Sequence, residues 1–277
     1  MLQLLLLLPL VYCAWERFFV IVLENADYSD VLQSRYMGNT LLSKGRLLTN
    51  YHGVTHPSQQ NYFAMTTGTY HFLNFDFTKD VGDYSIVDEL EAANVSWKTY
   101  QENYPGGCSR VSTADPVGDM FLYQRKHNPF ISLTRISGNA TRCANIVNAK
   151  QLKQDIVTNS VPQYVFYTPN MFNDGHDTSI EFADNWLQSF LEPLLANPAF
   201  ANTVFLITHD ENDDNFDFSN NQVYSLLVGG PIPPQTRDDN KYDHYSQITF
   251  VRERWNLPRY AADVKSEAFN LTSEYKH

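Results

Sequence analysis

Short apolar runs rich in β-branched and aromatic residues alternate along the chain with segments whose apolar residues recur at helical spacing. The runs predict buried strands, and the segments between them predict helices. The predicted strands cover 18–23, 45–51, 95–100, 163–167, 204–209 and 223–228. The predicted helices cover 26–33, 58–67, 85–93, 149–157, 177–195 and 244–255. This alternation predicts an α/β fold of three layers (α/β/α), with helices on both faces of a mostly parallel central sheet.

No Pro/Ser/Gly-rich linker or block of charge divides the 277 residues, so we expect one domain over residues 15–277. Residues 104–145 are punctuated by Gly, Pro and Asn. They predict a loop-rich insertion with short helices.

Residues 1–14 form an apolar stretch of signal-peptide length that is too short to span a membrane. An apolar extension of the first strand is the alternative, because the stretch carries no Lys or Arg. Removing it leaves Cys108 and Cys143, which form either one disulfide or two free thiols. Sequons begin at Asn94, Asn139 and Asn270, as in glycoproteins. We expect a secreted or extracellular protein, or one in the lumen of the secretory or vacuolar system.

The chain is acidic, with a net charge of −11 and a pI of about 5.1. That charge argues against nucleic acid and anionic membranes as partners. No basic amphipathic helix favours membrane binding, so we expect no stable membrane insertion, and no feature sets an oligomeric state. An anionic substrate would need a local positive focus, which a metal ion can supply.

Two of the predicted strands end in acidic pairs. Glu24 and Asn25 follow the first strand, and Asp210 and Glu211 follow the fifth. Ligand sites of α/β sheets collect at such strand ends, and hard divalent metals prefer oxygen ligands. The alternatives are that Asn25 caps a helix and that Asp210 and Glu211 belong to a solvated turn. A calcium loop starting at Asp210 is excluded, because its sixth position lacks Gly and its twelfth lacks Glu.

Ser58 lies at the start of a predicted helix, where backbone N–H groups and the helix dipole favour anions. Beside a metal it could act as an activated nucleophile. The alternative is a plain N-cap, the commoner role of Ser in this position. Asn61 follows one turn later and could donate to a phosphoryl oxygen.

His127, His176 and His244 lie in loops and are flanked by Asn, Asp or Gly. A single histidine is more often a surface or capping residue, but three in loops that follow strands favour a site. Their spacing matches neither HxH nor HExxH, which excludes a dedicated zinc protease. The absence of GxSxG argues against a nucleophile-elbow hydrolase.

At these residues the chain resembles the phosphoesterase family of secreted acid phosphatases, fungal types especially, and of bacterial phospholipases C. That family has an alkaline-phosphatase-like core. The matching segments, in family order, are 22–25, 55–62, 97–102, 126–130, 167–170, 174–177, 210–211 and 244–246. Residues 58–68 are also similar to the nucleophile stretch of nucleotide pyrophosphatases, which favours Ser58 over Thr55 or Thr66.

The resemblance implies roles for these residues. One divalent metal, of unassigned identity, would be held by Glu24, Asn25, Ser58, Asp210 and Glu211. The substrate would be bound by Asn61, His127 and Asp177, with His176 also near the phosphoryl group. His176 or His244 would protonate the leaving oxygen. Asn170 stands where two-metal relatives have Asp, which favours a single metal.

We therefore expect a metal-dependent phosphoric ester hydrolase, an acid phosphatase that acts on small phosphate monoesters through a phosphoserine. A phospholipase C or another phosphodiesterase is the alternative. A secreted binding homologue without turnover is the alternative from a different class.

Overall fold

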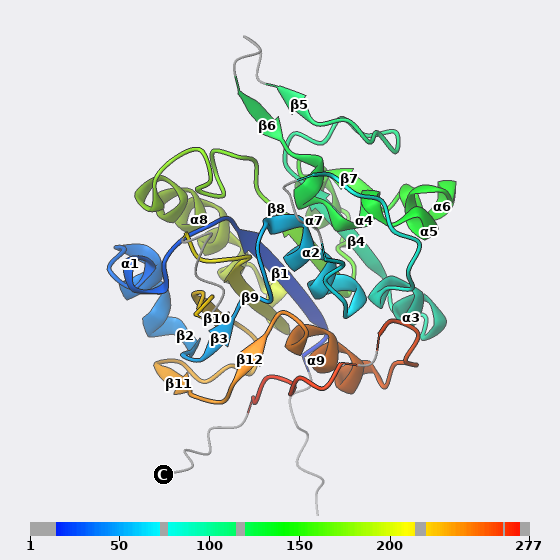
Figure 1. Cartoon of the computed structure of the whole chain (residues 1–277). Helices are drawn as coiled ribbons and strands as arrows, with labels where there is room; N and C mark the ends of the chain where they lie inside the picture. The colour runs from blue at the N-terminus through cyan, green and yellow to red at the C-terminus, as the bar shows by residue number, and fades with distance from the viewer. Residues whose placement is uncertain (1–14, 73–76, 115–119, 214–219, 263, 272–277) are drawn as a thin grey trace, which may run out of the picture.

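The computed structural model describes residues 15–72, 77–114, 120–213, 220–262 and 264–271, and its core is an eight-stranded sheet (Figure 1). The strand order is β11-β2-β10-β9-β1-β8-β4-β7. The bounds are β1 Arg17–Leu23, β2 Gly45–Leu48, β4 Trp97–Gln101, β7 Ile146–Asn148, β8 Tyr164–Thr168, β9 Thr203–His209, β10 Ser225–Val228 and β11 Thr236–Asp238. Every neighbouring pair is parallel except the two made by β10. The predicted mostly parallel sheet is confirmed.

Alternate side chains of β1 enter two separate cores, as the period of two in a strand requires. Phe18, Val20 and Val22 pack with the helices α2 and α9, whereas Phe19 and Ile21 pack on the other face. The helices of the first face are α2 Ser58–Thr67, α3 Ile86–Ala92 and α9 Ser246–Trp255. Those of the second are the π-helix η1 Tyr36–Leu41, α7 Gln151–Val157 and α8 Ile180–Leu195. In Figure 1 the helix α2 lies across the dark blue strand β1. The predicted three layers are confirmed.

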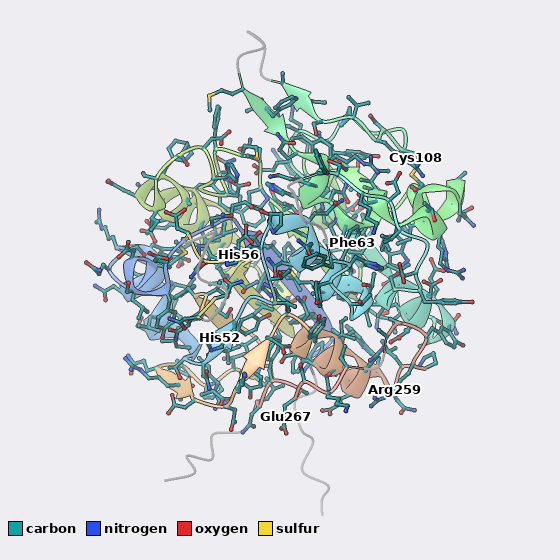
Figure 2. The ribbon with its side chains drawn as sticks, in the orientation of Figure 1. His52, His56, Phe63, Cys108, Arg259 and Glu267 are labelled. Atoms are coloured by element: carbon teal, nitrogen blue, oxygen red, sulfur yellow. A yellow bond between two sulfur atoms is a disulfide. The ribbon has the colours of Figure 1, made fainter. Side chains whose placement is uncertain are left out.

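Shorter elements fill the connections. The helical turns are α1 Tyr28–Val31, η2 Leu42–Lys44, η3 Arg125–His127, α4 Pro129–Ser132, α5 Thr134–Ser137, α6 Ala140–Cys143 and η4 Pro198–Phe200. Two small sheets pair β3 Tyr51–His52 with β12 Tyr242–Asp243, and β5 Thr113–Ala114 with β6 Phe121–Tyr123. Within 104–145, Cys108 and Cys143 form a disulfide, so the alternative of two free thiols is wrong (Figure 2).

The strand predicted over 45–51 is two strands, because the chain changes partners at Thr49 and Asn50. The backbone N–H of Thr49 donates to Asp238 in β11, and the carbonyl of Asn50 accepts from Tyr242 in β12. The strands β7, β11 and β12 were not predicted, because each has only two or three residues and shows no usable pattern.

Two predicted helices have different bounds. The helix predicted over 26–33 is the single turn α1, since the buried carboxylate of Asp184 accepts from the backbone N–H groups of Tyr36 and Met37 and starts η1 there. The helix predicted over 244–255 is α9, which begins two residues later, at Ser246. Beyond α9 the chain packs back on the core, where Phe269 contacts the rings of Tyr51 and Phe250.

The helix α2 has clear boundaries in the sequence. Pro57, which cannot donate a backbone hydrogen bond, precedes its first residue. Gly68 follows its last residue with φ of 75°, a left-handed conformation that Gly adopts without steric cost. The predicted bounds, 58–67, agree with the structure. No helix in the described ranges is both long and apolar enough to cross a membrane. The proposed signal peptide, residues 1–14, lies outside those ranges.

Candidate active site around Ser58

The acidic residues meet because the strands that carry them are neighbours in register. Leu23 of β1 lies beside His209 of β9, and the backbone N–H of Asp210 donates to the carbonyl of Leu23 at 3.0 Å. On the other side, the backbone N–H of Glu24 donates to the carbonyl of Asp174 at 3.1 Å. Glu24 therefore lies between Asp210 and Asp174 at the carboxyl edge of the sheet, where ligand sites of this fold class form.

Ser58 is the first residue of α2 and faces this acidic edge. Its Oγ lies 3.2 Å from Glu24 Oε2 and 3.2 Å from Glu211 Oε1. The hydroxyl makes no capping bond to the helix, and the N-cap residue is Pro57. The alternative that Ser58 is only an N-cap is therefore wrong.

One face of α2 carries further polar side chains, because residues three and four positions apart lie on the same side of a helix. Asn61 Nδ2 donates to Glu211 Oε2 at 3.2 Å, and its Oδ1 accepts from the backbone N–H of Val54 at 2.9 Å. Tyr62 donates its hydroxyl proton to Glu24 Oε1. Asn61, predicted to bind substrate, thus also holds the loop before Ser58 against Glu211.

Glu211 is surrounded by donors. Asn25 Nδ2 donates to its Oε1 at 3.2 Å, and His56 Nδ1 lies 2.9 Å from its Oε2. The alternative that Asn25 caps a helix is wrong, because the N-cap of α1 is Asp27. The sequence reasoning missed His56, although it stands two residues before Ser58. Figure 2 labels His56 close to α2, the helix on which Phe63 is labelled.

A second group of ligand-type atoms lies on the far side of Glu24. One ligand atom each from Glu24, His127 and Asp174 lies within 4.8 Å of the other two, and all three residues are buried. His127 Nδ1 is 3.4 Å from Glu24 Oε1 and 3.9 Å from Asp174 Oδ2. His127, predicted to contact substrate, has the position of a metal ligand here.

Asp174 is a second site residue to which the sequence analysis assigns no role, although it lies in the matching segment 174–177. Asn170 was weighed instead, yet its Oδ1 accepts from the backbone N–H groups of Phe172 and Asn173. It stabilises the loop and does not face the acidic cluster. The carboxylate that this segment brings to the cluster is that of Asp174, and the single metal inferred from Asn170 stays a prediction.

His176 and Asp177 lie at the rim of the cluster. The His176 ring centroid is 6.0 Å from that of His127, and its side chain is 33% exposed. His176 Nδ1 is 2.7 Å from Asp177 Oδ1. Asp177 was predicted to bind substrate. In the structure its carboxylate contacts His176 and orients that ring.

His244 is fully buried and has both ring nitrogens engaged. Its Nε2 contacts the main-chain carbonyl of Asp210, and its Nδ1 is 3.2 Å from the hydroxyl of Tyr51. Burial lowers the pKa of His244 to about 4, so the ring is neutral over most of the physiological range. His244 supports the end of β9 from behind.

The cluster concentrates negative charge in a buried place. Burial raises the pKa of Glu24 to about 7, although smaller contributions from His176, Tyr62 and Lys126 lower it. Burial also raises the pKa values of Asp174 and Asp210 well above those of ordinary aspartates. Both carboxylate oxygens of Asp210 are buried and find no hydrogen-bond partner among the described residues. The same holds for Asn25 Oδ1, Asp174 Oδ2 and His127 Nε2.

Burying an unpaired carboxylate costs about several kcal/mol of folding free energy, and a bound cation offsets this cost. The unpaired oxygens of this cluster therefore favour the binding of a cation. Carboxylate and amide oxygens with one imidazole suit a divalent metal ion. The donors present therefore fit the metal that the sequence predicted.

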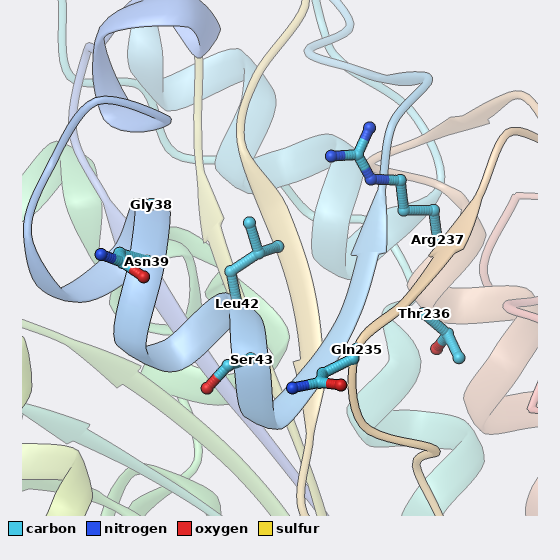
Figure 3. A pocket seen from close by; sticks show the side chains of 7 residues that line it. All are labelled: Gly38, Asn39, Leu42, Ser43, Gln235, Thr236 and Arg237. Carbon is cyan, nitrogen blue, oxygen red and sulfur yellow. The ribbon is translucent and has the colours of Figure 1, made fainter.

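Two cavities lie elsewhere on the described surface. A polar cleft of about 300 Å³ is lined by residues of 52–56 and 241–245 with Asn221, and it borders the site through His56. Figure 3 shows a second cavity, of about 240 Å³, between η1, η2 and β11. Its lining, which includes Asn39 and Arg237, shares no residue with the site.

The fold and the serine-centred acidic site define an α/β protein of the alkaline-phosphatase-like class. The chain belongs to the Phosphoesterase family, whose sequence profile matches residues 33–258. It is 42% identical over 252 residues to a probable acid phosphatase of Kluyveromyces lactis and 41% identical over 255 residues to an acid phosphatase of Aspergillus fumigatus. Each match covers 88% of this chain, but only 59% and 56% of those proteins. The chain thus spans less than two thirds of their length.

Among solved structures, a protein of the alkaline phosphatase superfamily from Vibrio parahaemolyticus aligns with a TM-score of 0.58 and 10% sequence identity. The match covers 89% of this chain and 67% of that one. The resemblance to the phosphoesterase family and the alkaline-phosphatase-like fold are both confirmed.

Proposed function

We propose that the protein is a metal-dependent phosphoric ester hydrolase, an acid phosphatase that acts on small phosphate monoesters through a phosphoserine. The observation that carries the proposal is the position of Ser58. Its hydroxyl stands at the amino end of α2 and lies 3.2 Å from each of two buried carboxylates. The names of the Kluyveromyces and Aspergillus relatives support the same activity.

The residues that would hold one divalent metal are Glu24, Asn25, Ser58, Asp210 and Glu211. The unpartnered oxygens of Asn25 and Asp210 support this set, and His127 with Asp174 extends it around Glu24. When bound, the metal neutralises phosphoryl oxygens and lowers the pKa of the serine hydroxyl.

Ser58 Oγ attacks phosphorus in line, forming the Oγ–P bond as the bond from phosphorus to the alcohol oxygen breaks. Glu211, which already accepts from that hydroxyl, takes its proton. The backbone N–H groups and the helix dipole at the start of α2 favour the phosphoryl anion. Water then attacks the phosphoserine, and a new P–O bond forms as the Oγ–P bond breaks and inorganic phosphate leaves. Glu211 returns its proton to Ser58 Oγ, and His176, which gives its proton to the leaving oxygen in the first step, takes one from the attacking water.

We propose that His176 protonates the leaving oxygen. Its ring is partly exposed at the rim of the cluster, and donation from Nδ1 to Asp177 leaves Nε2 for the leaving group. His244, the other histidine with this predicted role, is buried and holds the carbonyl of Asp210.

A secretory location is part of the proposal. The disulfide between Cys108 and Cys143 favours an oxidising compartment. Asn94 and Asn139, the acceptors of two sequons, are exposed. The apolar residues 1–14 support export as a signal peptide.

The decisive experiment compares wild type with Ser58→Ala on p-nitrophenyl phosphate after addition of Mg²⁺, Mn²⁺ or Zn²⁺. We expect the variant to lose at least about 10³-fold in kcat, as enzymes do without their nucleophile. Ser189→Ala is the control, since Ser189 lies on the remote helix α8 and its hydroxyl donates to the carbonyl of Asn185 in the same helix. Surviving turnover in Ser58→Ala would show that the nucleophile is wrong.

The runner-up functions are tested in the same assay. Wild type is offered bis-p-nitrophenyl phosphate and phosphatidylcholine besides the monoester. Preference for either diester would replace the phosphatase by a phosphodiesterase or phospholipase C. Failure to hydrolyse any of these esters with every metal would favour a binding homologue.

A further inference from the structure

Tyr62 contacts two candidate metal ligands at once, although neither the predicted site residues nor the proposed mechanism includes it. It lies one helical turn after Ser58 on α2 and is fully buried. Its hydroxyl donates to Glu24 Oε1, and its ring stacks on the imidazole of His127 with centroids 5.4 Å apart and planes inclined by 11°.

The hydrogen bond divides the two oxygens of Glu24 between different partners. Oε1 faces Tyr62 and His127, and this leaves Oε2 for Ser58 at 3.2 Å. The last torsion of a glutamate side chain is broad, so packing alone does not fix the carboxylate plane. The phenol therefore sets which oxygen points to the nucleophile.

The other carboxylates of the cluster are fixed differently. Glu211 accepts from Asn25 and Asn61, and Asp174 Oδ1 accepts from the backbone N–H of His176 at 2.9 Å. Among the described residues, the hydroxyls of Tyr62 and Ser58 donate hydrogen bonds to Glu24, while His127 Nδ1 lies farther away, at 3.4 Å from Oε1. Ser58 is itself the reacting group, so Tyr62 is the donor that can keep Glu24 in place during turnover.

The stacked ring has a separate effect on His127. The edge of the imidazole that carries Nδ1 faces Glu24 and Asp174, whereas one of its flat faces lies on Tyr62. Behind Tyr62, the ring of Phe166 in β8 lies 6.3 Å away and connects this stack to the sheet. Tyr62 thus positions an imidazole and a carboxylate with one rigid side chain.

We propose that Tyr62 is a positioning residue that orients Glu24 and His127 for a divalent metal ion and so raises the affinity of the site for that ion. The inference rests on the proposed function, because it presumes that the acidic cluster binds metal. Residues that orient metal ligands typically change metal affinity 10–100-fold when they are replaced.

The test is calorimetric titration of the chelator-treated protein with Mn²⁺ and with Zn²⁺, a readout that needs no substrate. Tyr62→Phe keeps the ring and removes the hydroxyl, and we expect its Kd to rise about 10–100-fold. Tyr100→Phe is the matched control. Tyr100 is also fully buried and donates to a carboxylate, Asp155 Oδ2 at 2.6 Å, in another part of the fold. Its Kd should stay within about twofold of wild type, since no candidate ligand is touched.

Activity supplies a second readout. The metal concentration for half-maximal rate should rise in Tyr62→Phe in proportion to Kd, and excess metal should restore kcat to within a few-fold. Tyr62→Leu, which also removes the stacked ring, should weaken binding further. A Kd for Tyr62→Leu equal to that of Tyr62→Phe would overturn the part assigned to stacking.

The results of these titrations test the role of Tyr62 separately from the proposed function. If wild type binds metal and Tyr62→Phe binds it equally well, the role of Tyr62 is wrong while the proposed function stands. Equal losses of thermal stability in Tyr62→Phe and Tyr100→Phe, without a change in Kd, would likewise reduce Tyr62 to a packing residue. If wild type binds neither ion, both the metal site and the role of Tyr62 are wrong.

Discussion

The hydroxyl of Ser58 lies 3.2 Å from Glu24 Oε2, although 34 positions separate the two residues in the sequence. The contact follows from where two regular elements end and begin. One apolar strand ends at Glu24, and one helix begins at Ser58 directly after Pro57. The site is therefore built from the ends of regular elements, which hold side chains more rigidly than loops do.

Asp210 and Asp184 are both buried carboxylates, and we predict opposite effects when each is replaced by Asn. Asp210 has two oxygens without hydrogen-bond partners among the described residues. Asp184 instead accepts from Ser34, Tyr36 and Met37 at 2.7–2.8 Å. In the presence of a chelator, Asp210→Asn should raise the melting temperature, because a buried unpaired charge is removed.

Asp184→Asn should lower the free energy of unfolding by about 1.5–3 kcal/mol, because charge-assisted hydrogen bonds are lost. Added Mn²⁺ should stabilise wild type and Asp184→Asn but not Asp210→Asn. Thermal denaturation with and without Mn²⁺ gives the melting temperatures of wild type and the two variants. A lower melting temperature for metal-free Asp210→Asn would contradict the assignment of unpaired charge to Asp210.

Gly53 fits closely behind the site, and we predict that Gly53→Ala reduces activity. A Cβ atom there would lie 2.5 Å from Asn221 Nδ2 and 2.9 Å from the carbonyl oxygen of Asp210. The neighbouring backbone must shift, and small displacements of catalytic groups reduce rates about 10²-fold. Gly82→Ala is the control, since its Cβ would meet only Thr134 Oγ1 at 3.6 Å. Equal kcat/KM for the two variants would show that the backbone of Asp210 is not critical.

The sequence predicted the regular elements well where the pattern was long. The strand ending at Glu24 and the helix starting at Ser58 have clear signals, an apolar run and a Pro–Gly pair. Asp174 was missed because it follows no strand directly. The main-chain hydrogen bond that its carbonyl accepts from Glu24 brings it beside the site. His56 and Tyr62 lie in the matching segment 55–62, but the sequence assigns them no role, because a single side chain has no pattern of its own until the fold places it.

The buried Asp155 gives a prediction for stability against pH. Burial alone would raise its pKa, but hydrogen bonds from Gln151, Lys98 and Tyr100 outweigh burial and hold the pKa below the usual value. A lowered folded-state pKa stabilises the protein above the unfolded-state pKa of about 3.9, and this stabilisation is lost as pH falls further through the folded-state pKa. Asp155→Asn should therefore be less stable than wild type at pH 7 and pH 5 by the same amount, about 1–3 kcal/mol.

The difference between the two proteins should shrink below about pH 3.9, where the wild-type carboxylate takes up its proton. Urea denaturation at pH 7, 5 and 3 measures it. If the difference in unfolding free energy between wild type and Asp155→Asn were larger at pH 3 than at pH 7, the pKa of Asp155 would not be lowered by folding.

We predict that the rate losses of His176 and His244 variants depend differently on the leaving group of the substrate. A general acid matters for a poor leaving group, such as the alkoxide of glycerol phosphate, and little for the acidic p-nitrophenol. His176→Asn should therefore lower kcat about 10²–10⁴-fold on glycerol phosphate and far less on p-nitrophenyl phosphate. His244→Gln should lower both rates by a similar factor, because His244 contacts the main chain of Asp210 and supports the site as a whole. Parallel assays of the two variants on the two esters, with metal in excess, measure the four ratios. A leaving-group-dependent loss in His244→Gln, together with a uniform loss in His176→Asn, would exchange the two roles.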